Sequence, residues 1–156
     1  MSNVILLVED NTSDEKLTLL AFRKCRVATE VVVVRDGAEA LAYLFGSGQF
    51  AAEPVLALPA VVLLDLKLPR IDGLEVLRRI RAHERTKLLP VVVLTASKED
   101  EDIIRSYSLG ANAYVRKPVD FAQFVETANT IGVFWLLLNE PPPPQRGVRC
   151  ANRSPY

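Results

Sequence analysis

Four short apolar runs recur along the chain and constrain its fold more than any other feature. The runs are Val4–Val8, Val31–Val34, Ala60–Leu64 and Pro90–Leu94. They are rich in Val, Ile and Leu, and polar residues do not alternate with the apolar ones. This pattern is typical of strands that are buried on both faces, as in a parallel sheet. Ala113–Val115 is a weaker fifth candidate.

Segments with helical periodicity separate the runs. Two apolar stripes with helical spacing are made by Leu17, Leu20, Ala21 and Lys24, and by Leu74, Leu77 and Ile80. The alternation of strand and helix repeats five times, which is typical of right-handed crossover connections. We therefore predict an α/β fold: a doubly wound five-stranded parallel sheet, of strand order 2-1-3-4-5, with five helices.

Capping motifs mark where four of these helices begin. Thr12–Glu15 and Ser97–Asp100 fit the pattern of a hydroxyl cap followed by an acidic residue three positions later. Asp36–Glu39 and Asp120–Gln123 fit it with Asp as the cap. The long connection Gly46–Pro59 is expected to be a surface loop.

The end of the chain has a different pattern. Apolar residues keep helical spacing from Phe121 to Leu138, and the stretch Val133–Leu138 is apolar on every side. Gly132 is a candidate for a kink or an end of this helix. We expect a main domain at 1–131, an apolar and proline-rich extension at 132–144, and a disordered tail at 145–156.

Composition narrows the function classes. The 19 basic residues balance the 19 acidic ones, so no overall positive field attracts nucleic acid or an anionic membrane. The longest apolar run has six residues, against the ~18 needed to span a bilayer, and no signal peptide is visible. Two distant cysteines fit a reducing compartment.

We expect a cytoplasmic protein without membrane contact. We also expect no direct DNA binding, because the 25 residues after Ile131 are too few for a DNA-binding module.

Polar groups follow four of the predicted strands. Glu9 and Asp10 follow the first, Asp65 the third, Thr95 the fourth and Lys117 the fifth. Because the carboxyl ends of parallel strands meet at one edge of the sheet, these groups are expected to converge. Three crowded carboxylates repel one another unless a cation lies among them. Such hard oxygen ligands suit Mg²⁺.

The same groups offer the chemistry of phosphoryl transfer. Asp65, at the centre of the sheet, can be a nucleophile that becomes an aspartyl phosphate. Lys117 and a cation would attract the phosphoryl group, and Thr95 could donate a hydrogen bond to it. Each residue taken alone is as often, or more often, a helix cap, a strand end or a surface charge. The combination carries the prediction.

Four stretches of the chain resemble the receiver domain of two-component response regulators. They are Ile5–Asn11, Leu63–Gly73, Val93–Ala96 and Gly110–Pro118, in the order and spacing of that family over about residues 2–131. Three further segments resemble the single-domain regulators that partner bacterial and cyanobacterial phytochrome kinases: Asp65–Pro69, Ser106–Ala111 and Phe134–Pro142.

The resemblance implies a flavodoxin-like receiver fold with a phospho-acceptor and a magnesium site. Asp65 would accept the phosphoryl group, and Thr95 and Lys117 would contact it. The Mg²⁺ ligands would be oxygen atoms, namely the carboxylates of Glu9, Asp10 and Asp65 and the backbone carbonyl of Lys67. The bond between Lys117 and Pro118 would be cis, aiming the lysine at the site.

The resemblance also implies a switch and a partner. Tyr114 matches an aromatic position that turns inward when Thr95 moves toward the phosphoryl group. The implied function is a single-domain response regulator rather than an enzyme. It would accept a phosphoryl group from a sensor histidine kinase, of which a bacteriophytochrome is one candidate, and then switch partner binding.

Two other functions remain open from the residues alone. A free-standing phosphatase of the aspartyl-phosphate type would use Asp65 in turnover, but such enzymes usually carry a second Asp two residues later, where this chain has Lys67. A flavodoxin-like cofactor binder is a more distant alternative and predicts a coloured protein.

The apolar stretch Val133–Leu138 predicts self-association. One domain has room to bury one face of such a segment, and the other face would be exposed to water. We expect a two-fold homodimer built from the fourth helix, the fifth strand, the fifth helix and this extension. The alternative is that Gly132 turns the segment back against its own domain.

Overall fold

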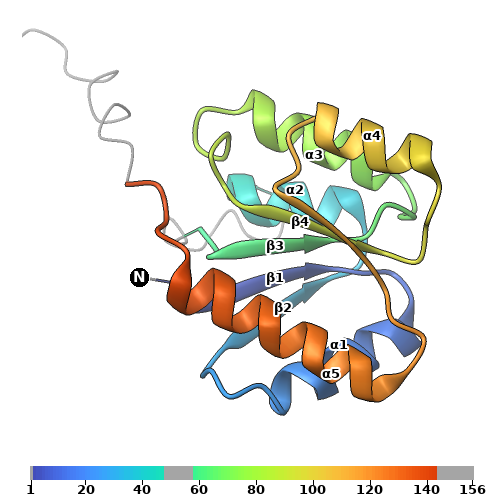
Figure 1. Cartoon of the computed structure of the whole chain (residues 1–156). Helices are drawn as coiled ribbons and strands as arrows, with labels where there is room; N and C mark the ends of the chain where they lie inside the picture. The colour runs from blue at the N-terminus through green and yellow to red at the C-terminus, as the bar shows by residue number, and fades with distance from the viewer. Residues whose placement is uncertain (1, 48–57, 144–156) are drawn as a thin grey trace, which may run out of the picture.

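The computed structural model describes residues 2–47 and 58–143, and strands and helices alternate along them (Figure 1). The strands are β1 (Val4–Val8), β2 (Glu30–Val34), β3 (Val61–Leu64), β4 (Val91–Thr95) and β5 (Ala113–Arg116). The helices are α1 (Thr12–Arg23), α2 (Gly37–Phe45), α3 (Gly73–Ala82), α4 (Asp100–Ser108) and α5 (Phe121–Gly132), followed directly by the π-helix η2 (Val133–Leu138).

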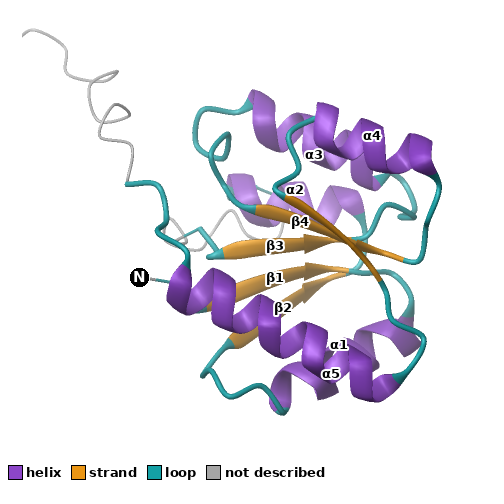
Figure 2. Cartoon of the chain, viewed as in Figure 1, coloured by secondary structure: helices purple, strands orange, loops and turns teal. Residues whose placement is uncertain are grey.

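All five strands are parallel and lie in the order β2-β1-β3-β4-β5, which confirms the predicted fold and topology. Helices cover both faces of the sheet, with α1 and α5 on one side and α2, α3 and α4 on the other (Figure 2). All strands therefore end at the same edge, and the connections that follow them gather there.

Each face of the sheet carries its own apolar core. Ile5 and Leu7 of β1 point into the cluster that includes Phe22 of α1 and Phe124 of α5. Leu6 and Val8 belong to the opposite cluster, with residues of α2 and α3. Successive side chains of a strand alternate between faces, so a central strand between two helical layers has to be apolar throughout. This explains the uninterrupted runs.

Two of the four predicted helix caps are correct. The carboxylate of Asp36 accepts a hydrogen bond of 2.7 Å from the backbone N–H of Glu39 at the start of α2. At the start of α5, Asp120 accepts one of 3.2 Å from the N–H of Ala122. Both side chains satisfy an N–H group that has no partner within its helix.

The other two caps were wrongly placed. The cap of α1 is Asn11 rather than Thr12, because the backbone at Asn11 is extended and its side-chain oxygen accepts from the N–H of Asp14 at 3.0 Å. The helix α4 begins after Glu99 without a side-chain cap. Ser97 instead donates a hydrogen bond of 2.6 Å to the carboxylate of Asp102.

The apolar stripe of α3 is confirmed, since Leu74, Leu77 and Ile80 are buried. The stripe predicted for α1 is confirmed at Ala21 but wrong at its other positions: Leu17 and Leu20 are 37% and 44% exposed, and Lys24 is exposed. The helix instead turns Glu15, Thr18, Ala21 and Phe22 inward. Thr18 can be buried because its hydroxyl donates to the carbonyl of Asp14 at 2.7 Å.

The α-helix α5 ends at Gly132 as predicted, but the π-helix η2 follows it directly, so the chain stays helical through the glycine. Its backbone is helical, with φ −60° and ψ −49°, and η2 continues the chain. A Cβ atom at this position would lie 2.8 Å from Sγ of Cys25, so the glycine admits a close approach between α5 and the end of α1. The tail at 145–156 and most of the connection Gly46–Pro59 lie outside the described residues.

The continuous helix Phe121–Leu138 has 18 residues and a mean hydropathy of 1.3, and 22% of it is buried. Within the described parts of the chain, it alone is long and apolar enough to cross a membrane. A count of uninterrupted apolar residues does not detect this helix, because polar residues interrupt the run. They leave the mean hydropathy of the whole helix high. Core helices of soluble proteins meet the same criteria, so a single helix of this kind is weak evidence for a membrane span.

A substitution at Gly73 tests how tightly the edge of the sheet is packed. A Cβ there would lie 2.3 Å from the carbonyl oxygen of Asp65 and 2.7 Å from Cα of Leu66, and both atoms are backbone. We expect Gly73→Ala to lower the free energy of unfolding by about 3 kcal/mol. Gly46→Ala is the matched control, with a left-handed φ of 66° but open space around it, and should cost about 1 kcal/mol. Urea denaturation of both variants gives the comparison, and equal losses would contradict it.

Candidate functional site

The carboxyl ends of the strands open into a cavity of about 610 Å³. The charged and hydroxyl side chains that line it include Asp10, Asp14, Asp65, Lys67, Thr95 and Lys117. They come from the residues that follow or end β1, β3, β4 and β5 and from the first turn of α1. Parallel topology alone brings these distant parts of the chain together.

Three carboxylates form a cluster at this edge. Oxygen atoms of Glu9, Asp10 and Asp65 all lie within 4.8 Å of one another. Glu9 and Asp65 are buried, at 1% and 6% exposure, and Asp10 is exposed. Burial raises the pKa of Glu9 to about 7; the hydrogen bond from Lys117 opposes the rise and the charge of Asp65 adds to it. This set of hard oxygen donors with excess negative charge fits a small divalent cation such as Mg²⁺ or Mn²⁺.

The side chain of Lys117 brings a positive charge to the carboxylate cluster. Its ammonium nitrogen lies 2.5 Å from Oε2 of Glu9, 2.8 Å from Oδ2 of Asp14 and 2.9 Å from Oδ2 of Asp65. The side chain is 8% exposed. Burial works to lower the pKa of Lys117, but the hydrogen bonds to Asp14, Glu9 and Asp65 outweigh it and raise the pKa above its ordinary value. The three carboxylates therefore favour the charged form of the lysine.

The expected cis bond between Lys117 and Pro118 is absent, since no cis peptide bond occurs among the described residues. The four-carbon side chain of Lys117 nevertheless places its ammonium group among the carboxylates.

The two oxygens of Asp65 have different partners. Oδ1 accepts the hydroxyl hydrogen of Thr95 at 2.9 Å and the backbone N–H of Lys67 at 3.2 Å. Oδ2 accepts from the ammonium of Lys117 at 2.9 Å. Three donors thus hold the carboxylate in one orientation at the rim of the cavity. An oriented carboxylate beside a cation can attack an electrophilic phosphorus atom.

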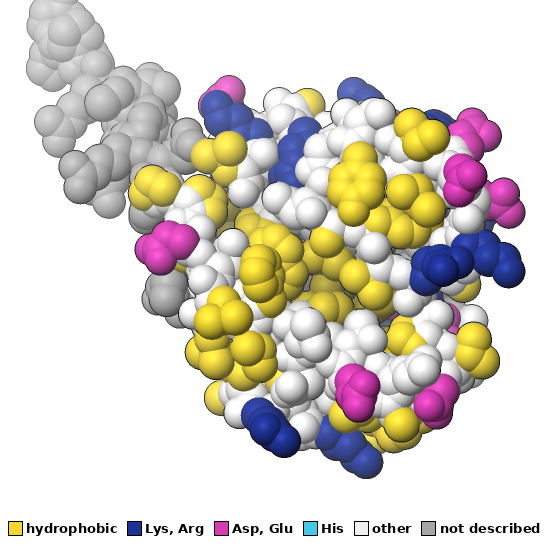
Figure 3. Space-filling view, in the orientation of Figure 1, with side chains coloured by type: hydrophobic (Ala, Val, Ile, Leu, Met, Phe, Trp, Pro, Cys, Tyr) yellow, Lys and Arg dark blue, Asp and Glu magenta, His cyan; other side chains and the backbone are white. Residues whose placement is uncertain are grey.

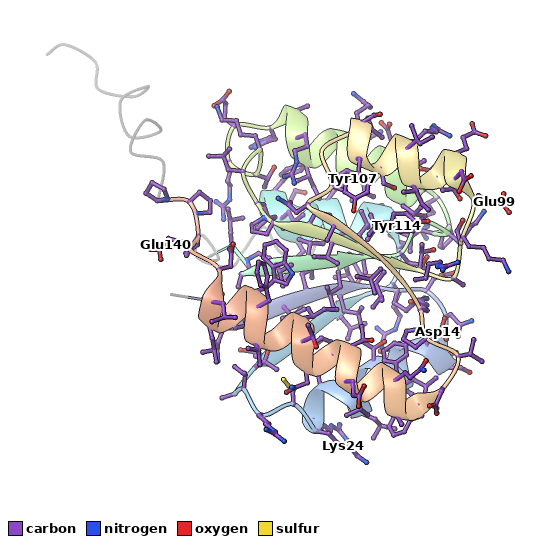
Figure 4. All side chains as sticks on the ribbon, in the orientation of Figure 1. Asp14, Lys24, Glu99, Tyr107, Tyr114 and Glu140 are labelled. Atoms are coloured by element: carbon purple, nitrogen blue, oxygen red, sulfur yellow. The ribbon has the colours of Figure 1, made fainter. Side chains whose placement is uncertain are left out.

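Tyr114 lies apart from this cavity. It is opposite Val93 in the register between β4 and β5, and its hydroxyl donates to the backbone carbonyl of Ser97 at 3.0 Å. Burial raises the pKa of the Tyr114 hydroxyl above its ordinary value. Figure 4 shows the side chain between β5 and α4. The hydrogen bond connects Tyr114 with the loop that follows Thr95.

Sequence reasoning missed Asp14. Its carboxylate lies 2.8 Å from the ammonium of Lys117 and lines the cavity, and Figure 4 shows it at the edge where the strands end. The signal that could have found it is its position in the first turn of α1, immediately after the loop that carries Glu9 and Asp10. That turn necessarily borders the same edge of the sheet.

Comparison with known proteins identifies the protein family in which this site geometry occurs. The family model "Response regulator receiver domain" matches residues 5–129. The "Probable methanogenesis regulatory protein FilR2" of Methanothrix harundinacea is 42% identical over 144 residues, covering 90% of this chain and 88% of that protein. The response regulator Rcp1 of Synechocystis is 38% identical over 133 residues, 85% of this chain and 88% of Rcp1.

Solved structures agree. The Mn²⁺-bound form of Rcp1 superimposes with a TM-score of 0.81 at 37% identity, over 90% of this chain and 99% of that structure. The bacteriophytochrome response regulator AtBRR is 54% identical, with a TM-score of 0.72, over 90% of this chain and 99% of that structure. The predicted resemblance to phytochrome-associated regulators is confirmed.

Asp10 tests whether the acidic cluster is built for a metal. Without divalent ions, Asp10→Asn should raise the free energy of unfolding by about 0.5 kcal/mol, because it removes one of several repelling charges at an exposed position. With saturating Mg²⁺ the order should reverse, since the wild type gains stability from bound metal and the variant gains little. Thermal unfolding with and without Mg²⁺ measures both effects. Glu140→Gln, an exposed acid outside the site, is the control; if it matches Asp10→Asn, the cluster is not a metal site.

Proposed function

The chain belongs to the family of response regulator receiver domains, which are phospho-acceptor signalling modules, and from this premise we propose the acceptor, the metal and the partners. Asp65 takes the phosphoryl group from a histidine kinase, and the reaction requires Mg²⁺. The observation that carries the proposal is the orientation of Asp65: Thr95 and Lys67 donate to one oxygen and Lys117 donates to the other.

The transfer is a substitution at phosphorus. A carboxylate oxygen of Asp65 forms a bond to the phosphorus of a phosphohistidine, the P–N bond breaks, and its electron pair stays on the imidazole nitrogen. The product is an acyl phosphate on Asp65. Lys117 and Thr95 donate hydrogen bonds to the transferred phosphoryl oxygens. Glu9, Asp10 and Asp65 and the backbone carbonyl of Lys67 would hold Mg²⁺, which would neutralise phosphoryl charge.

Thr95 and Tyr114 form the switch in this proposal. When Thr95 turns its hydroxyl from Asp65 to the phosphoryl group, the loop after β4 shifts with it. The carbonyl of Ser97 in that loop accepts a hydrogen bond from the Tyr114 hydroxyl. When the loop shifts, this hydrogen bond changes and the tyrosine ring turns inward. The consequence is a changed surface over α4 and β5.

The donor proposed for this chain is a cytoplasmic histidine kinase of the bacteriophytochrome type. AtBRR, at 54% identity, is a bacteriophytochrome response regulator, which supports this choice. FilR2, at 42% identity, carries the name of a methanogenesis regulator and represents a different signalling context. Phosphotransfer from a panel of purified kinases separates the two: transfer within seconds from a phytochrome kinase supports the proposal, and transfer only from other kinases contradicts it.

Labelling identifies the acceptor. Acetyl phosphate should phosphorylate the wild type only when Mg²⁺ is present, and the label should be labile to alkali, as acyl phosphates are. Asp65→Asn should abolish the label, because the amide is not a nucleophile. Asp36→Asn, which keeps a capping side chain outside the site, is the control. Undiminished labelling of Asp65→Asn would refute the assignment.

The C-terminal helix supports a homodimer. Trp135 and Leu136 pack against the core of their own domain, but Phe134, Leu137 and Leu138 are 45%, 63% and 69% exposed. Figure 3 shows hydrophobic side chains gathered on the face that carries this helix and α4. Hiding a few hundred Å² of such surface would contribute several kcal/mol at ~25 cal/mol per Å². A net charge of zero adds little repulsion between copies.

Two adjacent leucines test the dimer. We expect the wild type to sediment as a dimer at micromolar concentration and the double variant L137D/L138D to sediment as a monomer, because aspartates would be buried without partners at the interface. Trp135 is less suitable, since its packing against the domain core would mix folding with assembly. Leu17→Asp, an exposed apolar position on α1, is the control.

A monomeric wild type, with or without a phosphoryl mimic, would contradict the dimer. If a monomeric wild type also binds vesicles of neutral lipid through the helix Phe121–Leu138, the exposed face belongs to a membrane contact instead.

A further inference from the structure

Asp14 has a place in the site that the proposed function does not use. It lies in the first turn of α1, with its backbone N–H bound to the side chain of Asn11 at 3.0 Å. Its carboxylate reaches the ammonium of Lys117 at 2.8 Å and is 31% exposed. The capping hydrogen bond fixes the backbone of Asp14, so the side chain is aimed from a rigid helix start at the lysine.

The ammonium group of Lys117 is fully used in this arrangement. It has three N–H donors and no acceptor. The structure gives it three carboxylate partners: Glu9, Asp14 and Asp65. When a phosphoryl group is attached to Asp65, one donor has to turn to a phosphoryl oxygen. The remaining two contacts then decide where the lysine stays.

Glu9 and Asp14 are unequal holders of the lysine. Glu9 is buried, and its other oxygen already accepts the N–H of Asn11 at 3.1 Å. It also belongs to the carboxylate cluster with Asp10 and Asp65, and a cation bound there would compete with Lys117 for its oxygens. Asp14 lies outside that cluster, and its carboxylate forms an ion pair with Lys117. Its hold on the lysine is independent of the metal.

We propose that Asp14 is a positioning residue for phosphoryl transfer, which holds the ammonium of Lys117 beside Asp65 while Glu9 serves the acidic cluster. This inference rests on the proposed role of Asp65 as acceptor. It extends the site from the ends of the strands to the first turn of α1. A purely electrostatic role would act in the opposite direction, because one more negative charge repels an anionic phosphoryl donor.

The test is the initial rate of labelling by acetyl phosphate at saturating Mg²⁺. Asp14→Asn should slow labelling about tenfold, because Lys117 loses a charged partner and drifts from the phosphoryl group. Asp14→Glu should restore part of the rate, since a carboxylate is again within reach. Asp100→Asn is the matched control, as an exposed acid in the first turn of α4. It should label at the wild-type rate.

Two further measurements distinguish positioning from a general effect on the fold. The ammonium hydrogens of Lys117, detected through the attached ¹⁵N nucleus, should exchange slowly with water in the wild type and rapidly in Asp14→Asn. The free energy of unfolding in urea should be nearly unchanged. In a Lys117→Met background, adding Asp14→Asn should not slow labelling further, because the group it positions is gone.

The labelling rates decide separately on the role of Asp14 and on the role of Asp65. Wild-type or faster labelling of Asp14→Asn overturns the positioning role, and so does an additive loss in the Lys117→Met background. Asp65→Asn runs in the same assay. If it remains labelled, the proposed acceptor is wrong; if it is unlabelled while Asp14→Asn labels normally, the inference about Asp14 alone fails.

Discussion

One ammonium group among carboxylates is the interaction on which the site depends. Lys117 contacts Glu9, Asp14 and Asp65 at 2.5–2.9 Å, with most of its side chain shielded from water. Taking these charges out of water is costly, and the mutual contacts compensate only when every donor finds an acceptor. The negative charges still outnumber the positive one, which leaves the site suited to a divalent cation and a phosphoryl group. The same imbalance makes the site a place where stability is given up for function.

The parallel sheet makes this concentration of charge tolerable. Strands β1, β3 and β4 are buried between two helical layers, and each layer has its own apolar core. The cores supply the free energy that offsets the repulsion at one edge. Because every strand ends at that edge, the charged residues need no dedicated loop to bring them together. The rigid frame also fixes Asp65 through three donors before any ligand arrives.

The C-terminal helix has a buried inner side and an exposed apolar end. Its inner side, including Phe124 and Ile131, completes the core beside α1. Its last turns leave Phe134, Leu137 and Leu138 exposed on the face shared with α4. In the proposed switch, a change at Thr95 would act through the loop after β4, where the Ser97 carbonyl accepts a hydrogen bond from the Tyr114 hydroxyl.

The sequence by itself determined the fold, the strand order and the convergence of Glu9, Asp10, Asp65, Thr95 and Lys117. The fold class and the convergence follow from apolar runs of strand length and from the rule that parallel strands end at one edge, and the strand order is a common one for doubly wound sheets. Side-chain identity and spacing were enough.

The stripe of α3 could be predicted from the sequence, but only the tertiary structure decided which side of α1 is buried and which atoms touch. The stripe Leu17–Leu20 looked like a core face, but packing against α5 turned Thr18 and Phe22 inward instead. The pattern marked Gly132 as the end of an α-helix, but it did not show that a π-helix follows or that the Cys25 sulfur leaves no room for a Cβ atom there. Asp14 carried no strand-end signal, and its contact with Lys117 spans 103 positions of sequence. Contacts of that separation depend on the rotation and tilt of packed helices, which periodicity does not encode.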